Sequence, residues 1–203
     1  MKLYGMATRA PNPRRVRILL AEKGIDLAET PIDLMKGEHK AADYLAKNSL
    51  GQIPTLELDD GTTISESIAI CRYFEEIHPE PALFGRGALE KAQVEMWVWR
   101  IECVLLAPAR YFWRHAHPRT AALLTQFKDF GESNRDTYAA AQHWLDNELR
   151  GRKFISGEAY SMADICALCT VDFATSIGLP LEPNAANLTA WHGRVSGRPS
   201  AKA

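Results

Sequence analysis

The sequence predicts an α/β domain over residues 1–78, a linker over residues 79–87 and an all-α domain over residues 88–203. Short β-rich runs alternate with helical patterns before the linker, the linker is rich in proline and glycine, and no strand pattern follows it. Because the expected order of elements before the linker is βαβα–ββα, we expect an α/β sandwich with a mixed sheet.

Local signals place the elements of the first domain. Two prolines that lie close together should keep residues 11–13 in a loop. The helix that follows carries its apolar residues on one face, and Gly24 comes just after its end. The expected strands are residues 2–4, 30–33, 55–58 and 62–64, the last two forming a hairpin, and the expected helices are residues 14–23, 39–46 and 67–77.

Only helical patterns follow the linker. Residues 89–115 form a long helical stretch in which Pro108 should cause a kink. Residues 121–149 are predicted to be one long helix, with Gly131 weakening its middle. Two further helices are expected over residues 162–176, apolar on most sides and therefore buried, and over residues 185–196.

Composition excludes several classes of partner. The 203 residues include 24 basic and 25 acidic side chains, which argues against nucleic acid or an anionic membrane as the main partner. No run approaches the roughly 18 apolar residues of a membrane span, and the N-terminus has no signal-peptide pattern. The four cysteines lie in apolar helical patterns, so we expect a reduced, cytoplasmic protein.

The most informative feature is a pair of segments ten residues apart. Ile53-Pro54 precedes a β-rich run, and a proline that enters a strand marks an edge or a tight turn, where a cis peptide bond is least costly. Such a loop would expose the backbone N–H and C=O of Ile53 to an extended ligand. Glu66 and Ser67 begin an apolar helix, whose free N–H groups attract a carboxylate. Together the segments predict a pocket for a small, anionic, peptide-like molecule.

These segments resemble a known family. Residues 51–56 (Gly-Gln-Ile-Pro-Thr-Leu) and 66–70 (Glu-Ser-Ile-Ala-Ile) look like the glutathione site of cytosolic glutathione transferases, and residues 161–165 (Ser-Met-Ala-Asp-Ile) resemble the capping box of that family's helical domain. Residues 36–40 and 56–62 look closest to bacterial and fungal members that lack the usual catalytic tyrosine or serine. The resemblance implies a thioredoxin-like first domain, glutathione as co-substrate, a small electrophile as second substrate, and a homodimer.

The resemblance also implies roles for individual residues. Ser67 would bind the α-carboxylate of the γ-glutamyl group and Glu66 its ammonium, although a serine and a glutamate at a helix start also serve as plain caps. His39 would donate to the glycyl carboxylate, and Gln52 would contact the ligand backbone or its carboxylate. Tyr111, together with Phe112, Trp113 and Met6, would line an apolar pocket for the second substrate, or simply belong to the core.

The group that stabilises the thiolate is open. Proline or alanine occupies the positions after the first strand where family members place serine or cysteine. Asn12 resembles an asparagine that faces the sulfur in some bacterial members, and the N-terminus of the following helix would add its dipole. Alternatively, His115 resembles a histidine that holds a water near the sulfur in the related fungal type. Tyr4 and Thr8 are less favoured alternatives.

Two other patterns predict no chemistry. Cys166 and Cys169 have CxxC spacing but lie inside a helix, away from the N-terminus where a reactive thiol is favoured, so we expect core packing. His115 and His117 would point to different faces of a helix, and with no third ligand evident we expect no metal site.

The sequence leaves three functions to weigh. The first is addition of the glutathione thiolate to small, hydrophobic electrophiles, by substitution or Michael addition. The second is glutathione-dependent reduction of peroxides or disulfides, and the third is a glutathione-binding scaffold without catalysis.

Overall fold

The chain divides into two compact units in the computed structural model, which describes residues 1–6 and 10–203. The first unit comprises Met1–Leu83 and Pro199–Ala203, and the second comprises Phe84–Arg198. The last five residues thus belong with the α/β unit, whereas the sequence led us to expect them in the helical domain. Among the described residues, no helix is long and apolar enough to cross a membrane.

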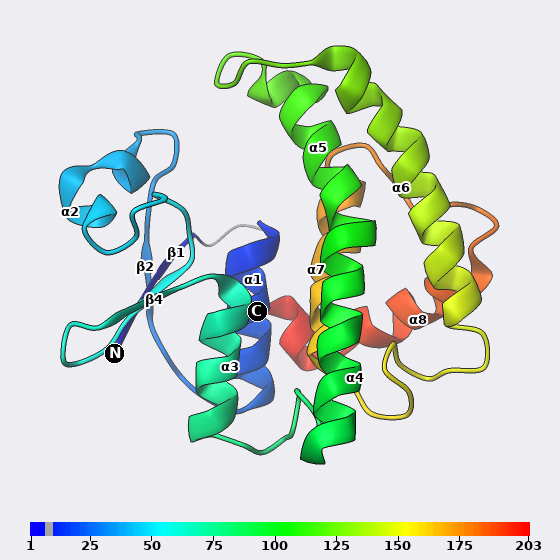
Figure 1. Cartoon of the computed structure of the whole chain (residues 1–203), viewed down its shortest axis with the longest axis horizontal. Helices are drawn as coiled ribbons and strands as arrows, with labels where there is room; N and C mark the ends of the chain where they lie inside the picture. Colours follow the sequence, from blue (N-terminus) through cyan, green and yellow to red (C-terminus); the bar gives the residue numbers. More distant parts are fainter. Residues whose placement is uncertain (7–9) are drawn as a thin grey trace. The chain divides into compact units, whose positions relative to one another are not determined.

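The first unit is built on a four-stranded mixed sheet with the order β2-β1-β3-β4 (Figure 1). β1 runs parallel to β2 and antiparallel to β3, and β3 and β4 form an antiparallel hairpin. This mixed sheet with helices confirms the thioredoxin-like arrangement. The elements are β1 (Lys2–Gly5), α1 (Pro11–Glu22), β2 (Glu29–Pro31), the 3₁₀ turn η1 (Glu38–Lys40), α2 (Ala42–Leu45), β3 (Thr55–Glu57), β4 (Thr63–Ser65), α3 (Ser67–Ile77) and the 3₁₀ turn η4 (Pro199–Lys202).

Helices α1 and α3 pack together and share the core with the sheet. Val16 and Leu19 of α1, Ile70 and Phe74 of α3, and Leu56 of β3 are fully buried. Burial of each such side chain contributes about 1.5–3 kcal/mol, so the apolar faces read from the sequence fix how these helices pack.

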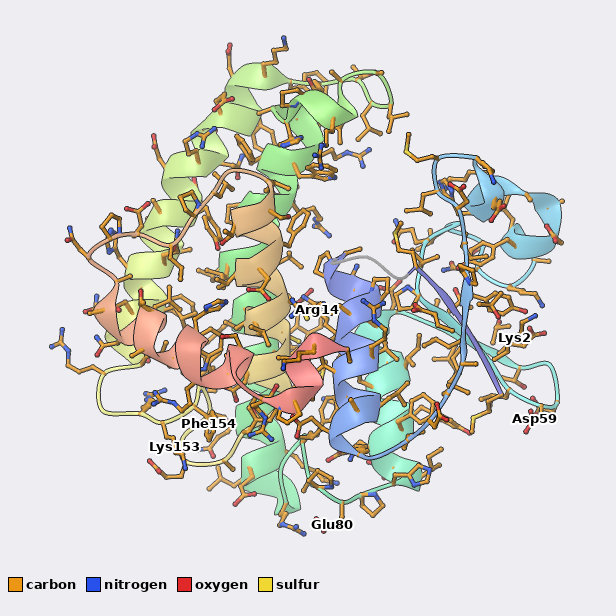
Figure 2. All side chains as sticks on the ribbon, turned by 180° about the vertical axis from the view of Figure 1, so that it is seen from behind. Lys2, Arg14, Asp59, Glu80, Lys153 and Phe154 are labelled. Carbon is orange, nitrogen blue, oxygen red and sulfur yellow. The ribbon has the colours of Figure 1, made fainter. Side chains whose placement is uncertain are left out.

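The C-terminal segment is fastened to α1. The guanidinium of Arg14 donates to the carbonyl oxygen of Ala201 at 2.8 Å, and the Ser200 hydroxyl donates to the carboxylate of Glu22. Figure 2 shows Arg14 on α1, where this contact is made. The helix that carries Asn12 is therefore held from outside the sheet by the end of the chain.

The expected loop over residues 11–13 is wrong, because α1 begins at Pro11. The first turn of a helix tolerates proline, since the N–H groups of that turn have no partner within the helix. Pro11 and Pro13 therefore start the helix instead of delaying it.

The second unit is all helical, as expected. Its elements are α4 (Gly87–Arg100), the π-helical turn η2 (Ile101–Leu106), α5 (Ala107–His115), the 3₁₀ turn η3 (Pro118–Thr120), α6 (Lys128–Glu148), α7 (Met162–Ser176) and α8 (Ala186–Ser196). α7 is buried on nearly every side, and its Cys166 and Cys169 are fully buried, which agrees with core packing. Pro108 lies in the first turn of α5. Because proline has no N–H to donate to the carbonyl of Val104, four residues earlier, the helix is distorted one turn before Pro108, at η2.

The single helix expected over residues 121–149 is wrong, because α6 begins only at Lys128. Side chains hold the preceding residues in turns. The Thr120 hydroxyl donates to the carbonyl of Trp113 at 2.7 Å, and the Gln126 amide donates to the carbonyl of His117 at 2.9 Å. Gly131 lies in the first turn of α6, where a Cβ would come within 2.6 Å of the His115 backbone. The glycine thus permits close approach of α5 and α6.

Candidate functional site

The β3–β4 hairpin brings the two predicted segments together. Thr55 of β3 pairs with Ser65 of β4, so Pro54 and Glu66 lie side by side at the same end of the hairpin. The Ile53–Pro54 peptide bond is cis. In the described part of the chain, no hydrogen bond uses the backbone N–H or C=O of Ile53. The arrangement leaves an unpaired stretch of backbone beside the start of α3.

Glu66 has an unusual backbone conformation at this point. It is the residue before α3, its side chain is exposed, and its φ of 69° makes it the one non-glycine residue with positive φ among the described residues. Such a conformation costs on the order of 1–3 kcal/mol and is concentrated at functional sites. A glutamate therefore occupies a backbone conformation that favours glycine.

Ser67 lies over a buried cation. It is the first residue of α3 and is 5% exposed, and its hydroxyl accepts a hydrogen bond from the guanidinium of Arg15 at 3.5 Å. Arg15 is 1% exposed. The guanidinium and the free N–H groups of the helix N-terminus both attract an anion, so a carboxylate is the group that this end of α3 would bind.

Sequence reasoning missed Arg15. The signal was present, because Arg15 lies three and four residues before Ile18 and Leu19 and so shares the buried face of α1. A charged residue on an apolar face calls for a partner, but only the tertiary structure shows that its guanidinium donates to the Ser67 hydroxyl.

Gln52 is held by its backbone. Its carbonyl oxygen accepts hydrogen bonds from the hydroxyl of Tyr44 at 2.7 Å and from the side-chain amide of Asn48 at 2.8 Å, while its own side chain is exposed. Tyr44 and Asn48 are buried, and burial raises the pKa of the Tyr44 hydroxyl, so it stays a donor. These two residues, which the sequence did not single out, fix the loop that leads into Ile53 and leave the Gln52 side chain free for a ligand.

His39 lies against the same loop. The ammonium of Lys40, its neighbour in η1, donates to the carbonyls of Leu50 at 2.9 Å and Gly51 at 3.3 Å. Gly51 has a φ of 56°, and a Cβ there would come within 2.5 Å of the His39 carbonyl oxygen. The His39 Nδ1 atom is buried, with no hydrogen-bond partner within the described residues. Burial, and then the charge of Lys40, lower the pKa of His39, so the imidazole is neutral at pH 7.

Asn12 lies at the exposed start of α1. It is the second helical residue, between Pro11 and Pro13, and the preceding residue Ala10 provides no side-chain cap. Its backbone N–H and side-chain amide are therefore the donors that this first turn can offer, since proline has none. Thr8, a less favoured alternative for the same role, lies outside the described residues.

Tyr4 has another role. Its hydroxyl donates to the carboxylate of Glu57 at 2.5 Å, and the ammonium of Lys47 pairs with the same carboxylate at 2.8 Å. Lys47, and then Tyr4, lower the pKa of Glu57. Tyr4 thus joins a polar network on the sheet.

In the second unit, α5 and the start of α6 form an aromatic cluster. The ring of Tyr111 lies 5.3 Å from that of Phe130, and His115 lies 5.6 Å from Phe127 and 5.4 Å from Phe130 between ring centres. The Nδ1 atom of His115 accepts from the backbone N–H of Phe127 at 3.4 Å. In a neutral imidazole the proton is then on Nε2. The half-buried His115 thus has a fixed tautomer with one donor to offer.

Within residues 1–6 and 10–203, no group of three His, Cys, Asp or Glu side chains lies close enough together to hold a metal ion.

Models of two known protein domains match most of the chain. A model of the glutathione S-transferase N-terminal domain matches residues 10–77, and a model of the glutathione S-transferase C-terminal domain matches residues 117–199. The chain is 40% identical to glutathione S-transferase 2 of Saccharomyces cerevisiae over 196 residues, which cover 95% of this chain and 84% of that protein.

Solved structures give the same result. The crystal structure of Gtt2 from Saccharomyces cerevisiae matches with a TM-score of 0.93 at 39% identity, covering 100% of this chain and 99% of that one. A glutathione S-transferase domain-containing protein from Marinobacter aquaeolei matches with a TM-score of 0.92 at 34% identity, covering 98% of this chain and 99% of that one. Both domain models and the full-length relatives therefore agree that this chain belongs to the glutathione S-transferase family of enzymes.

Proposed function

We propose that the chain joins the thiolate of glutathione to small, hydrophobic electrophiles in the cytoplasm, as a detoxification enzyme. The observation that carries the proposal is the β3–β4 register, which sets the unpaired Ile53 backbone beside Glu66 and Ser67. A γ-glutamyl peptide has the matching groups: an extended backbone, an α-carboxylate and an ammonium. Family membership supports the same co-substrate.

Each residue then has one role. Ser67, with Arg15 beneath it, binds the α-carboxylate, and Glu66 binds the ammonium. The Ile53 backbone pairs with the peptide, and Gln52 and His39 bind toward the glycyl carboxylate. The thiolate sulfur forms a bond to an electrophilic carbon, the leaving group departs with its electron pair, and the thiol proton goes to solvent. In an addition, the carbon adjacent to the acceptor group takes up the proton.

Calorimetric titration with glutathione, with the ultraviolet absorbance of the bound thiolate measured at two pH values, tests the proposal. Tight binding with thiolate present below the pKa of about 8.5 of a free thiol is expected. Ser67→Ala should weaken binding about tenfold or more, because it removes a hydrogen bond to a charged group. Ser196→Ala, at the end of α8, is the matched control. Binding without thiolate would favour a scaffold or a reductase, and absence of binding would refute the site.

Asn12 and His115 are the two proposed sources of thiolate stabilisation. Asn12→Ala removes an amide donor from the first turn of α1, and His115→Asn removes the imidazole but keeps an acceptor for the Phe127 N–H. The variant that raises the pKa of the bound thiol, while the affinity for glutathione stays unchanged, identifies the residue that stabilises the thiolate. If neither raises it, both assignments are wrong.

We further propose a homodimer that forms through the outer face of α4. Val94, Trp97 and Val98 point into the core, whereas Leu89, Met96 and Trp99 are exposed. These three, with Ala92 and the exposed Cys103, repeat at alternating spacings of three and four residues, which is the pattern of a helix seam that packs against another helix.

Trp99→Glu should convert the dimer to a monomer, because it places a charge in the middle of the seam. Light scattering after size-exclusion chromatography measures the mass, and Leu123→Glu, also at an exposed apolar position, is the control. A wild-type protein that is monomeric at micromolar concentration would contradict this proposal.

A further inference from the structure

The C-terminal segment, residues 199–203, packs on helix α1. It belongs to the same compact unit as α1, its η4 turn contacts that helix, and the C-terminus lies beside the helix in Figure 1. Ser200 and Ala201 are buried. Terminal residues are poorly held in most domains unless something ties them down. The burial of this segment therefore depends on its contacts with the helix.

Hydrogen bonds join the segment to α1 at two levels of the helix. The guanidinium of Arg14 donates to the carbonyl oxygen of Ala201 at 2.8 Å, and the hydroxyl of Ser200 donates to the carboxylate of Glu22. Arg14 and Glu22 are eight residues apart, which is about 12 Å along a helix. Because contacts at two separate levels fix both the place and the direction of a rod, the segment holds α1 along most of its length.

The first turn of α1 has no side-chain cap to hold it. Its N-cap residue, Ala10, makes no side-chain hydrogen bond to the turn, whereas a capping side chain would contribute about 1 kcal/mol. The backbone N–H of Arg14 donates to the Ala10 carbonyl at 3.3 Å, which is longer than the usual range for this bond. The contact between the Arg14 side chain and the C-terminal segment therefore provides a substitute attachment for this end of the helix.

The same end of α1 carries groups of the proposed glutathione site. Arg15 follows Arg14 directly, and its guanidinium donates to the Ser67 hydroxyl at 3.5 Å. That distance is at the limit of a hydrogen bond, so a displacement of α1 by about half an ångström would break the contact. Because consecutive Cα atoms are about 3.8 Å apart, a movement of Arg14 also moves Arg15. The C-terminal segment is thus linked to Ser67 through α1.

We propose that the C-terminal segment positions α1 for glutathione binding, and that Ser200 is a positioning residue which sets where the Arg15 guanidinium meets Ser67. The inference rests on the proposed function, because it concerns the α-carboxylate bound at Ser67. Ser200 acts through Glu22 and the helix, without touching the ligand. If the segment only stabilised its unit, loosening it would lower the Tm and leave the glutathione affinity of the folded protein unchanged.

Charge reversal at the attachment tests this inference. Ser200→Asp places a second carboxylate against that of Glu22, so it should loosen the segment and weaken glutathione binding about fivefold. Adding Glu22→Lys restores an attraction and should recover the wild-type affinity. The control Ala203→Asp adds the same charge at an exposed position of the same segment and should bind as the wild type.

Calorimetric titrations measure the affinities well below the Tm of each variant, and thermal unfolding checks that each is folded. If Ser200→Asp does not fold, Ser200→Ala takes its place. It removes only the hydroxyl that donates to Glu22, so a two- to threefold loss of affinity, about 0.5 kcal/mol, is then expected.

A double-mutant cycle shows whether the segment acts through the contact between Arg15 and Ser67. Ser67→Ala removes the hydroxyl that the guanidinium meets. If Ser200→Asp acts by displacing Arg15 from that hydroxyl, it should cause no further loss of affinity in the Ser67→Ala background. A general loosening of the unit would instead weaken binding by the same factor in both backgrounds.

A loss of affinity that Glu22→Lys reverses and that is absent in the Ser67→Ala background would support the inference. Unchanged affinity in Ser200→Asp, whatever its Tm, would overturn it and leave the proposed function standing, and so would an equal loss in both backgrounds. A wild-type protein that binds no glutathione would refute the proposed function, and this inference with it.

Discussion

Replacing Glu66 by glycine should make the protein more stable and make it bind glutathione more weakly. Glu66 has a φ of 69°, a conformation that glycine adopts without the clash of a Cβ atom. Its carboxylate is exposed and accepts no hydrogen bond from the N–H groups at the start of α3, as the side chain of a capping residue would. We therefore propose that Glu66 serves ligand binding, at the expense of local backbone strain.

The size of the effect follows from two opposing terms. The strain at a non-glycine residue in this region is about 1–3 kcal/mol, and the extra freedom of glycine in the unfolded chain offsets about 0.5–1 kcal/mol of the relief. Glu66→Gly should therefore raise the free energy of unfolding by about 1 kcal/mol, which is an increase in Tm of about 2–4 °C for a chain of this length. Glu66→Ala keeps the Cβ atom, so its Tm should equal that of the wild type.

Affinity should respond differently. Both variants lose the carboxylate, and an exposed charged contact to the ammonium of glutathione is worth about 1 kcal/mol, or about fivefold in Kd. Scanning calorimetry measures the Tm and isothermal titration measures the Kd. The backbone reasoning is refuted if alanine and glycine give the same Tm. The assignment of Glu66 to the glutathione site is refuted if neither variant changes the Kd.

The remaining predictions concern the loop, the carboxylate site and the helical unit. The affinity for S-methylglutathione, in which the thiol is blocked, should rise as the pH falls from about 7.5 to about 5.5. Burial and Lys40 lower the pKa of His39 in the free protein, and a bound carboxylate should raise it again, so protonation of His39 favours binding. His39→Asn should remove this pH dependence of the affinity in calorimetric titrations. Tyr44→Phe should reduce the free energy of unfolding by about 1 kcal/mol and weaken glutathione binding several-fold, since one donor to the Gln52 carbonyl is lost; unchanged values in urea unfolding and calorimetry would contradict this. Asp164→Ala should destabilise the protein by about 3–5 kcal/mol in urea unfolding, because it leaves the Trp191 Nε1–H and two buried backbone N–H groups without an acceptor. A cost of only about 1 kcal/mol would show that water replaces the carboxylate.

Local patterns in the sequence predicted most of the elements correctly. The helix Ser67–Ile77 and the strands of the hairpin follow from apolar periodicity and turn residues that lie within a few positions of one another. The capping residues Ser161 and Asp164 likewise identify the start of α7 in advance, and Asp164 accepts the Ser161 backbone N–H at 3.0 Å. Where local signals are ambiguous, the prediction failed. A proline can start a helix as well as prevent one, and Pro11 starts α1.

Residue types at short, fixed spacings were enough to predict the class of fold, the family and the segments that we propose form the glutathione site. Further residues reach the proposed site only through the packing of distant elements. Arg15 beneath Ser67, and Tyr44 on the carbonyl of Gln52, are contacts that sheet register and helix packing create. No sequence pattern predicted the positive φ of Glu66, because a glutamate does not indicate that backbone conformation. Contacts between residues distant in sequence depend on how whole elements pack, and no short window of sequence contains that information.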